Sequence, residues 1–486
     1  MTALRGITAR LPGLAALAFL ALPGSGLAQE TAEERCADLS ALVIDAVHVT
    51  STRVMPAADG KPAYCELLAT ARPAISIEVR LPLEDWNGKY YQVGCGGFCG
   101  ILGRADKGDG FINAMGPGLA KGYATATSDS GHHGLSVVDA GWAYNNPHAE
   151  RDWGWRSIGE TQRVARNAIK AFYGKGASQK YFQGCSTGGR MAHMASLKYP
   201  EVFSGIISGA PAMDYTGLVA LKMAWIDQAN SDAKGEAILK PGKDALIGDE
   251  VMRQCDGLDG KNDGLIADPR QCQADLSVLA CKEGADPKTC LSPAELGVIE
   301  KWRQGPQNAA GEQLYPGGIP AGSEPFWWLW LTGKEGGGGK LVPVFAKNFG
   351  AYMAFPEDPG PTYSTQDFDF ETDPARLATM AAVYNSDSPD LSAFREAGGK
   401  MIVWHGWADA IVTPYKTVDW HEKAAAAAGG EEALAESVQL FMIPGMDHCG
   451  LLPGPGGIGQ ASIDPLSALE AWVEEGQVPT TILKGE

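Results

Sequence analysis

The residues Gly184-Cys185-Ser186-Thr187-Gly188 constrain the fold of this chain more than any other stretch. They match Gly-x-Ser-x-Gly, the pattern of a sharp turn between a strand and a helix that presents a serine hydroxyl. Glycines are needed there because flanking β-carbons would clash with the neighbouring strands. The pattern alone is common, so its context decides between such a turn and an ordinary glycine-rich loop.

The flanking sequence favours the strand–turn–helix interpretation. Residues 180–183 predict a short strand, and residues 190–199 predict a helix that stops before Pro200. Residues 202–209 are an apolar run typical of the next buried strand. Strand, turn, helix and strand in this order are typical of an α/β-hydrolase, so we predict an α/β fold of that type.

The alternation of strands and helices is interrupted once along the chain. After Pro211 it stops, and residues 213–395 are rich in Gly, Pro and Trp and contain four of the ten cysteines. Apolar strands resume at 400–405 and 438–443. We therefore predict a hydrolase core made of residues 29–212 and 396–486, with a lid domain inserted over 213–395.

The first 28 residues predict a cleavable signal peptide. Arg5 and Arg10 give a positive start, and residues 11–22 are apolar but too short to cross a bilayer. Gly26-Leu27-Ala28 is a small-residue cleavage site, so the mature chain is expected to begin at Gln29. Export to the periplasm or the medium follows; an uncleaved membrane anchor is the alternative.

Charge and cysteine content fit an exported protein. The formal net charge of −18 argues against nucleic acid or an anionic membrane as a partner. Ten cysteines without any Cys-x-x-Cys spacing predict disulfides rather than a zinc site. Cys36 and Cys65 both lie in the N-terminal segment and are expected to pair.

A nucleophilic serine needs a histidine base and an acid that orients it. In α/β-hydrolases the acid and then the base follow the serine, each in a loop after a strand. Asp409 comes just after the strand at 400–405, and His448 just after the strand at 438–443. The predicted triad is therefore Ser186, Asp409 and His448.

Two neighbours of the triad are weaker candidates. Asp447 is adjacent to His448 and cannot easily reach back to its imidazole. His405 is an alternative base, but it lies at the end of a strand, where a pocket-lining or core role suits it better.

A glycine-rich loop follows the predicted strand at 89–93. Its sequence, Gly94-Cys-Gly-Gly-Phe-Cys-Gly100, lets backbone amides approach a substrate without side chains in the way. We expect the N–H of Gly96 or Gly97, with that of Thr187, to form the oxyanion hole. A flexible surface turn is the alternative.

A cysteine adjoins each end of the predicted proton relay. Cys185 precedes Ser186, and Cys449 follows His448. A disulfide between them would join the serine turn to the histidine loop and hold both side chains close before substrate binds.

Cys-Ser, Asp and His-Cys in this order resemble the tannase and feruloyl esterase family of α/β-hydrolases. The resemblance extends over nearly the whole mature chain, including the glycine loop, the Gly-Cys-Ser-Thr-Gly-Gly turn and His405-Gly-Trp-Ala-Asp409. It implies a serine carboxylesterase that works through an acyl-enzyme, needs no organic cofactor, and joins Cys185 to Cys449. The family also includes the enzyme that hydrolyses mono(2-hydroxyethyl) terephthalate.

An acidic stretch of the lid predicts a cation site. Asp256, Asp259 and Asp263, separated by glycines, can surround a hard cation with oxygen ligands. Similar loops in the family bind a structural Ca²⁺, which implies these side chains and the carbonyls of Lys261 and Leu265 as ligands; a solvated acidic loop is the alternative. The disulfides that go with this resemblance are Cys255–Cys272 around the loop, Cys281–Cys290 and Cys95–Cys99.

Substrate choice is expected to come from the lid. Trp327 and Trp328 belong to an aromatic run that suits either a pocket wall for a flat phenolic acyl group or the lid core. A tannase would need polar partners for galloyl hydroxyls, and a terephthalate monoester would need a cation, for which Arg376 and Arg395 are candidates.

The sequence thus predicts a secreted esterase of aromatic esters, most simply of the hydroxycinnamoyl or feruloyl type. A tannase and a mono(2-hydroxyethyl) terephthalate hydrolase are the alternatives within the same chemistry. A non-catalytic binding protein on a hydrolase scaffold is the alternative of a different class, which the intact triad and its cysteines argue against.

Overall fold

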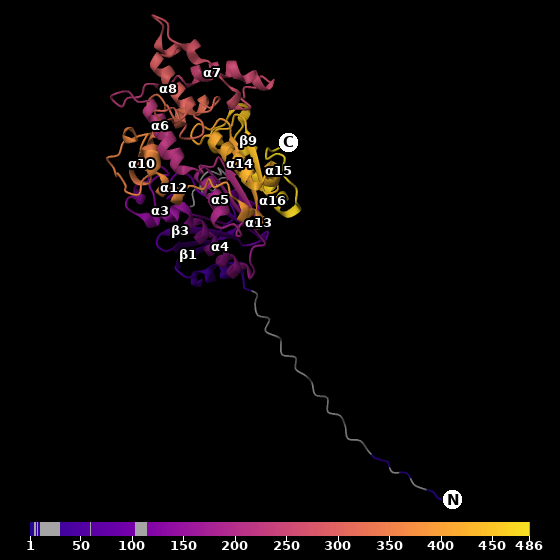
Figure 1. Ribbon diagram of the computed structural model, residues 1–486. Coiled ribbons are helices and arrows are strands. Elements are labelled where there is room, and N and C mark those ends of the chain that lie inside the picture. The colour runs from indigo at the N-terminus through magenta and orange to yellow at the C-terminus, as the bar shows by residue number, and fades with distance from the viewer. Residues whose placement is uncertain (4–5, 7, 10–29, 59, 103–113, 486) are drawn as a thin grey trace.

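The computed structural model describes residues 1–3, 6, 8–9, 30–58, 60–102 and 114–485 of the chain (Figure 1). Arg5, Arg10 and residues 11–28, on which the predicted signal peptide and its cleavage site depend, lie outside the described residues. Among the helices that the structure describes, none is both long and apolar enough to span a membrane.

The described residues form a nine-stranded sheet with the order β1-β2-β3-β5-β4-β6-β7-β8-β9. β1, β2, β3 and β5 pair antiparallel, whereas the strands from β5 through β4 to β9 pair parallel. The bounds are β1 Val47–Met55, β2 Tyr64–Ala71, β3 Ile75–Pro82, β4 Lys89–Val93, β5 Ala124–Ser128, β6 Gln179–Cys185, β7 Gly205–Gly209, β8 Lys400–Gly406 and β9 Val438–Ile443.

Both faces of the sheet are buried, because successive side chains of a strand point to opposite faces. In β7, Ile206 packs with one hydrophobic cluster and Ile207 with another. Helices α4 (Ser157–Tyr173) and α5 (Thr187–Lys198) cover the first face, and α16 (Pro465–Glu475) covers the second. These layers confirm the predicted α/β fold.

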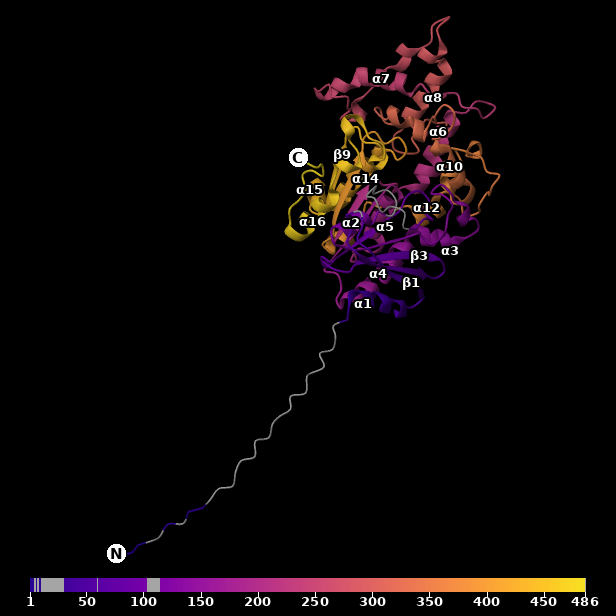
Figure 2. The same ribbon diagram turned by 180° about the vertical axis from the view of Figure 1, so that it is seen from behind.

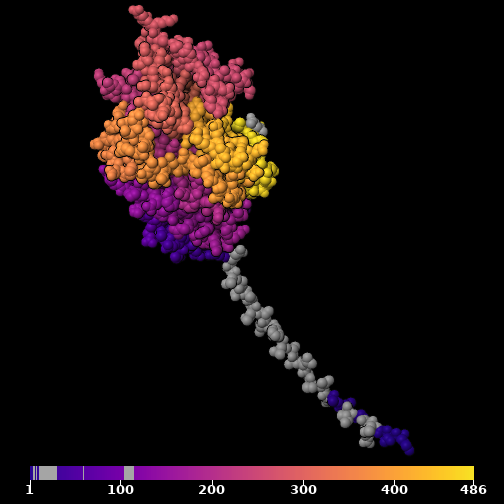
Figure 3. All heavy atoms as spheres, viewed as in Figure 1, coloured from indigo at the N-terminus to yellow at the C-terminus, as the bar shows by residue number. Residues whose placement is uncertain are grey.

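A long insertion separates two neighbouring strands. β7 ends at Gly209 and pairs directly with β8, which begins at Lys400. The main helices of the insertion are α6 Met223–Ala229, α7 Asp244–Cys255, α8 Pro293–Gln304, α9 Trp327–Trp330, α10 Leu341–Tyr352 and α12 Ala378–Tyr384. A π-helical turn, η4 (Gly217–Lys222), precedes α6. The pink part of the insertion, with α7 and α8, lies at the end of the molecule opposite β1 and α4, whereas the orange part, with α10 and α12, lies beside the core (Figures 1, 2 and 3).

All ten cysteines are paired, in five disulfides. Two of them lie in the insertion, and one spans 264 residues of sequence. The pairs are Cys36–Cys65, Cys95–Cys99, Cys185–Cys449, Cys255–Cys272 and Cys281–Cys290, the same pairs that the sequence and the family resemblance lead us to expect.

Candidate active site

The turn at Ser186 presents a serine between a strand and a helix. β6 ends at Cys185 and α5 begins at Thr187, so Ser186 alone connects them. Its φ of 63° and ψ of −123° are rare for a residue with a β-carbon, and such strain is typical of functional sites. A β-carbon at Gly184 would lie 2.4 Å from the backbone of Gly188, which explains why residue 184 is glycine, and one at Gly188 would lie 3.1 Å from the carbonyl oxygen of Cys95.

His448 is held next to this turn by a disulfide. The histidine is buried in the loop after β9, and the following residue, Cys449, is bonded to Cys185. The Cα atoms of the two cysteines are 6.0 Å apart. The immediate neighbours of Ser186 and His448 are therefore covalently joined, although β7, the insertion and β8 lie between them in sequence.

Asp409 receives hydrogen bonds on both carboxylate oxygens. It lies in the loop after β8, is completely buried, and its Oδ2 is 2.6 Å from Nδ1 of His448. Its Oδ1 accepts the N–H groups of Ile411 and Val412 at 3.0 and 2.8 Å. Burial alone would raise the pKa of Asp409, but the charge of His448 and hydrogen bonds from His405 and His448 lower it below its ordinary value. An ionised Asp409 can orient the imidazole of His448 and stabilise its protonated form.

His405 occupies the core position, one of the two that the sequence left open. It is completely buried beside Asp409 and is not among the described lining residues of the pocket at Ser186. Its Nε2 is 3.1 Å from Asp409 Oδ2 and 2.9 Å from the carbonyl oxygen of Val412, and its Nδ1 is 2.7 Å from Thr417 Oγ1. Because a carbonyl only accepts, the hydrogen belongs on Nε2, and His405 is a second donor to the acid rather than a base.

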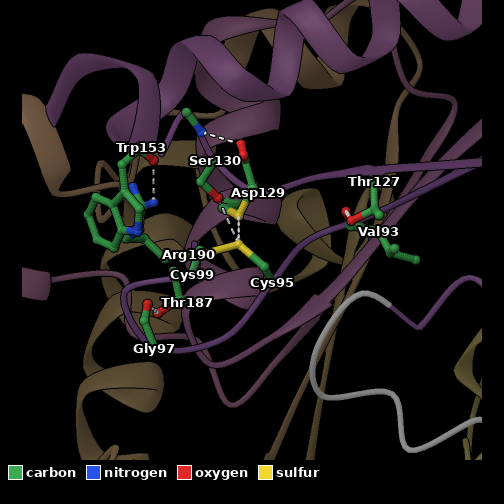
Figure 4. The surroundings of a disulfide bond; sticks show 12 residues. Val93, Cys95, Gly97, Cys99, Thr127, Asp129, Ser130, Trp153, Thr187 and Arg190 are labelled. Atoms are coloured by element: carbon green, nitrogen blue, oxygen red, sulfur yellow. Dashed lines mark hydrogen bonds between the residues drawn. A yellow bond between two sulfur atoms is a disulfide. The ribbon is translucent and has the colours of Figure 1, made fainter. Parts of the chain in front are cut away.

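The glycine loop packs against the start of α5. The Thr187 hydroxyl donates to the carbonyl of Gly97 at 2.7 Å, and the Cys95–Cys99 disulfide spans the same loop (Figure 4). Gly97 has a φ of 55°, and a β-carbon there would lie 2.3 Å from the carbonyl oxygen of Val137. The N–H groups of Gly96 and Gly97 donate to no acceptor in the described part of the chain. That of Thr187 opens a helix, where N–H groups lack partners within the helix.

A small apolar pocket lies beside Ser186. Its free volume is about 20 Å³, room for on the order of one water molecule, so a larger group enters only if side chains or insertion helices move apart. No described lining residue is charged. The described lining comprises Gly97, Ser186, Thr187, Ala212, Tyr215, Leu218, Val219, Met223, Phe345, Ile411 and Val412.

Comparison with known proteins places this site in a family. The family model described as tannase and feruloyl esterase matches residues 62–484. The chain belongs to the tannase and feruloyl esterase family. It is a carboxylic ester hydrolase.

Three family members illustrate the similarity. An uncharacterized esterase of Xanthomonas campestris pv. campestris is 34% identical over 98% of this chain and 88% of its own length. The mono(2-hydroxyethyl) terephthalate hydrolase of Piscinibacter sakaiensis is 32% identical over 84% of this chain and 74% of its own length. The crystal structure of feruloyl esterase B from Aspergillus oryzae has a TM-score of 0.80 and 25% identity, and covers 93% of this chain and 92% of that chain.

Within this esterase, the aromatic run of the insertion does not line the pocket with the residues that the sequence suggested. Trp327 is buried in the insertion, where its N–H donates to Ser323 Oγ at 2.9 Å and its ring packs edge-on against Trp302. Trp328 packs under the Lys334 ammonium group, 3.6 Å from the ring centroid. Neither is among the described lining residues of the pocket at Ser186, and Trp327 has the lid-core position that the sequence left open.

Trp330, at the end of the same helix, contacts the base loop instead. Its N–H donates to Asp447 Oδ1 at 3.0 Å, and its ring is perpendicular to that of His448 at a centroid distance of 5.6 Å. In the sequence, Trp330 stands out only as the last ring of the aromatic run at 326–330, and Asp447 only as a poor candidate for the acid of the triad. The position of Asp447 directly before the predicted base is the sequence feature that could have singled it out.

Lys222 is a second residue that the sequence analysis missed. It ends the π-helical turn η4 and is completely buried. Its ammonium group donates to the carbonyl of Ile411 at 3.3 Å. The N–H of the same Ile411 donates to Asp409. Burial lowers the pKa of Lys222 to about 7, although the charge of Asp409 opposes this. A π-helical turn is often found at functional sites, and this one also supplies Leu218 and Val219 to the pocket.

The predicted calcium loop has oxygen donors of the right kind, but its carboxylates are not gathered. Asp256 Oδ1 accepts the N–H groups of Asp263 and Gly264, Asp259 Oδ1 accepts that of Lys261, and Asp263 Oδ1 accepts that of Leu265. No group of three or more acidic, histidine or cysteine side chains is close enough for a metal site within the described ranges. Each carboxylate keeps a second oxygen, so the donor set fits Ca²⁺ in chemistry while the bound arrangement requires the side chains to turn.

Proposed function

We propose that this protein is an exported serine esterase that hydrolyses esters of aromatic acids of the hydroxycinnamoyl type, with Ser186, His448 and Asp409 as its triad. One observation carries the proposal. The buried 2.6 Å contact between His448 and Asp409 is tied to the turn of Ser186 by the Cys185–Cys449 disulfide. A binding protein would have no need of a base, an acid and a covalent tie to a strained serine turn.

The proposed reaction follows from the positions of these groups. His448 takes the proton of Ser186 as the hydroxyl oxygen attacks the ester carbonyl, and Asp409 stabilises the imidazolium. The N–H groups of Thr187 and of Gly96 or Gly97 hold the oxyanion. His448 then gives its proton to the leaving alcohol, and water, deprotonated by the same histidine, hydrolyses the acyl-enzyme.

The lining of the pocket supports an uncharged aromatic acyl group. The aliphatic side chains of Leu218, Val219 and Ile411 and the ring of Phe345 suit the face of a hydrocarbon ring. A galloyl group would bring three hydroxyls to a lining whose Thr187 and Tyr215 hydroxyls already contact Gly97. A terephthalate monoester would bring a carboxylate to a described lining that offers no cation.

The candidate cations of the insertion are engaged elsewhere. Arg376 pairs with Asp373 and packs over Phe355, and Arg395 donates to the carbonyl of Ala433. The relative from Piscinibacter sakaiensis nevertheless makes the terephthalate monoester a necessary member of any substrate panel.

The test is kcat/KM of the wild type and Ser186→Ala on methyl ferulate, methyl gallate, mono(2-hydroxyethyl) terephthalate and p-nitrophenyl acetate. We expect methyl ferulate to be the best aromatic substrate of the wild type. The alanine variant should lose at least about 10³-fold and should not react with a fluorophosphonate. Full activity of the alanine variant would disprove the triad, and preference for methyl gallate or mono(2-hydroxyethyl) terephthalate over methyl ferulate would disprove the substrate class.

We further propose export and a structural calcium ion. Five disulfides and the predicted signal peptide support export, because disulfides persist in oxidising compartments. Asp256, Asp259 and Asp263 with the carbonyls of Lys261 and Leu265 would hold the Ca²⁺, which would stabilise the insertion without taking part in the reaction.

A further inference from the structure

Asp447 is a buried carboxyl group that the proposed triad does not use. It directly precedes His448 and is completely buried. One oxygen, Oδ1, accepts the indole N–H of Trp330 at 3.0 Å, and the other has no hydrogen-bond partner among the described residues. The indole of Trp330 supplies the side-chain hydrogen bond of this carboxyl, and the backbone of the adjacent His448 also interacts with it. Loss of the indole bond would remove a partner from a buried polar group, which costs free energy.

Trp330 contacts the same loop a second time. Its ring stands perpendicular to the His448 imidazole, with the centroids 5.6 Å apart. This edge-to-face arrangement is one that aromatic rings favour. Trp330 belongs to α9, 117 residues before Asp447, and is buried. The insertion therefore touches both the base and the residue before it.

The contact supplies a restraint that Asp409 cannot supply alone. The hydrogen bond at Nδ1 fixes one edge of the imidazole but leaves the ring free to tilt about that bond. The ring of Trp330 restricts this tilt, and its bond to Asp447 fixes the backbone from which His448 projects.

We propose that Trp330 is a positioning residue for His448, acting through its ring and through Asp447, so that the base is aligned only while the insertion is docked. The proposal rests on the proposed function of His448 as the base. It assigns the insertion a part in aligning the proton relay, besides any part in choosing the substrate.

The chain offers a matched control on the same helix. Trp327 is also buried in α9, its N–H also donates one hydrogen bond, and its ring also packs edge-on against another ring, that of Trp302. Trp327→Phe and Trp330→Phe therefore remove the same group from similar surroundings, and only the second removes a contact to the base loop.

We expect Trp330→Phe to lower kcat about tenfold on the best ester, with KM changed less than about twofold. The rate of fluorophosphonate labelling of Ser186 should fall to a similar extent. Trp327→Phe should keep kcat within about twofold, while both variants lose thermal stability to a similar extent. Asp447→Asn keeps an oxygen for the indole and should remain near wild type, whereas Asp447→Leu should resemble Trp330→Phe.

A proton NMR measurement tests the positioning without any substrate. The far-downfield signal of the proton between His448 and Asp409 should be visible in wild type and Trp327→Phe, and broadened or shifted in Trp330→Phe. Equal losses of kcat in the two phenylalanine variants, or a change confined to KM, would overturn the proposal. If the wild type neither hydrolyses esters nor reacts with fluorophosphonate, the proposed function fails. The positioning role is overturned separately if the NMR signal is unchanged in Trp330→Phe.

Discussion

Cys185 and Cys449 form a disulfide across 264 residues of sequence, and each is the direct neighbour of a proposed catalytic side chain. The serine turn belongs to β6 and α5, whereas the histidine loop follows β9 at the far edge of the sheet. Two strands, β7 and β8, lie between them in the sheet. The disulfide thus fixes the distance between the serine turn and the histidine loop, which the packing of the strands alone would not fix.

Removing this disulfide should therefore reduce activity as well as stability. We expect Cys185→Ala with Cys449→Ala to lower the free energy of unfolding by about 2–5 kcal/mol and kcat by at least about tenfold. Urea unfolding and steady-state kinetics measure the two effects. The control is Cys281→Ala with Cys290→Ala in the insertion, which closes a short loop and should leave kcat unchanged. Loss of stability with full kcat below the melting transition would show that the bond does not align the site.

His405 should support the acid rather than act as a base. His405→Leu removes one hydrogen bond from Asp409 Oδ2 and leaves the Thr417 hydroxyl without its acceptor. The pKa of Asp409, which this bond helps to keep below its ordinary value, should rise. Since the relay needs Asp409 ionised, the pH–rate profile of kcat/KM should lose activity at a higher pH on its acid side than in wild type.

Thr417→Val is the matched control for His405. It removes the hydroxyl at Nδ1 but keeps the histidine beside Asp409. We expect about a tenfold loss of kcat in His405→Leu and a smaller loss in the threonine variant. Inactivation by His405→Leu as complete as that by His448→Ala would instead favour His405 as the base.

The sequence predicts most of the sheet because local pattern determines it. The bounds of β4 and β9 match the predicted strands at 89–93 and 438–443. A short run that contains apolar residues and ends at Gly or Pro is too short for a helix and therefore predicts a strand. The hairpin of β1 and β2 was not predicted. β1 is mostly exposed and carries polar residues, and the pairing of an edge strand depends on its neighbour rather than on its own sequence.

The roles of single site residues are harder to predict than the residue types. The order Ser186, Asp409 and His448 follows from motif and topology, but the place of His405 depends on Thr417, which α14 (Pro414–Ala428) brings from outside the motif. Likewise, the aromatic run suggests rings near the site, yet only packing of the insertion against the core decides that Trp330 faces His448.

Lys222 should make the free energy of unfolding depend on pH between the lowered pKa of this buried lysine and its pKa in the unfolded chain. The pKa of Lys222 is about 7 in the folded protein and about 10.4 in the unfolded chain. Between these values the unfolded chain holds more protons, so this group makes stability rise with pH. Lys222→Met should therefore be more stable than wild type by on the order of 5 kcal/mol below pH 7, and the gain should shrink toward pH 10. Urea unfolding of both proteins at pH 6.5, 8 and 9.5 measures the difference.

Lys416 is the control for this prediction, because it is a buried lysine with partners. Its ammonium group lies 2.9 Å from Asp387 and 3.7 Å from Asp214, and these charges raise its pKa although burial opposes them. Lys416→Met should destabilise the protein at neutral pH, since it leaves the half-buried carboxylates of Asp214 and Asp387 without their positive partner. A gain in Lys222→Met that does not vary with pH would mean that Lys222 is not protonated on unfolding in this window.

Calcium should stabilise the insertion if the acidic loop binds it. Saturating Ca²⁺ at about 100 times its Kd would add about 2.7 kcal/mol to the unfolding free energy, and EDTA would remove it. Differential scanning calorimetry of the wild type and Asp259→Asn, with Ca²⁺ or EDTA, should show a calcium-dependent rise of Tm in the wild type alone. Asp286→Asn is the control, because Asp286 lies outside the loop and its Oδ1 accepts the N–H of Lys288, which caps another turn of the same insertion. A Tm of the wild type that is the same in Ca²⁺ and EDTA would leave the loop as a solvated acidic turn whose carboxylates serve their own backbone N–H groups.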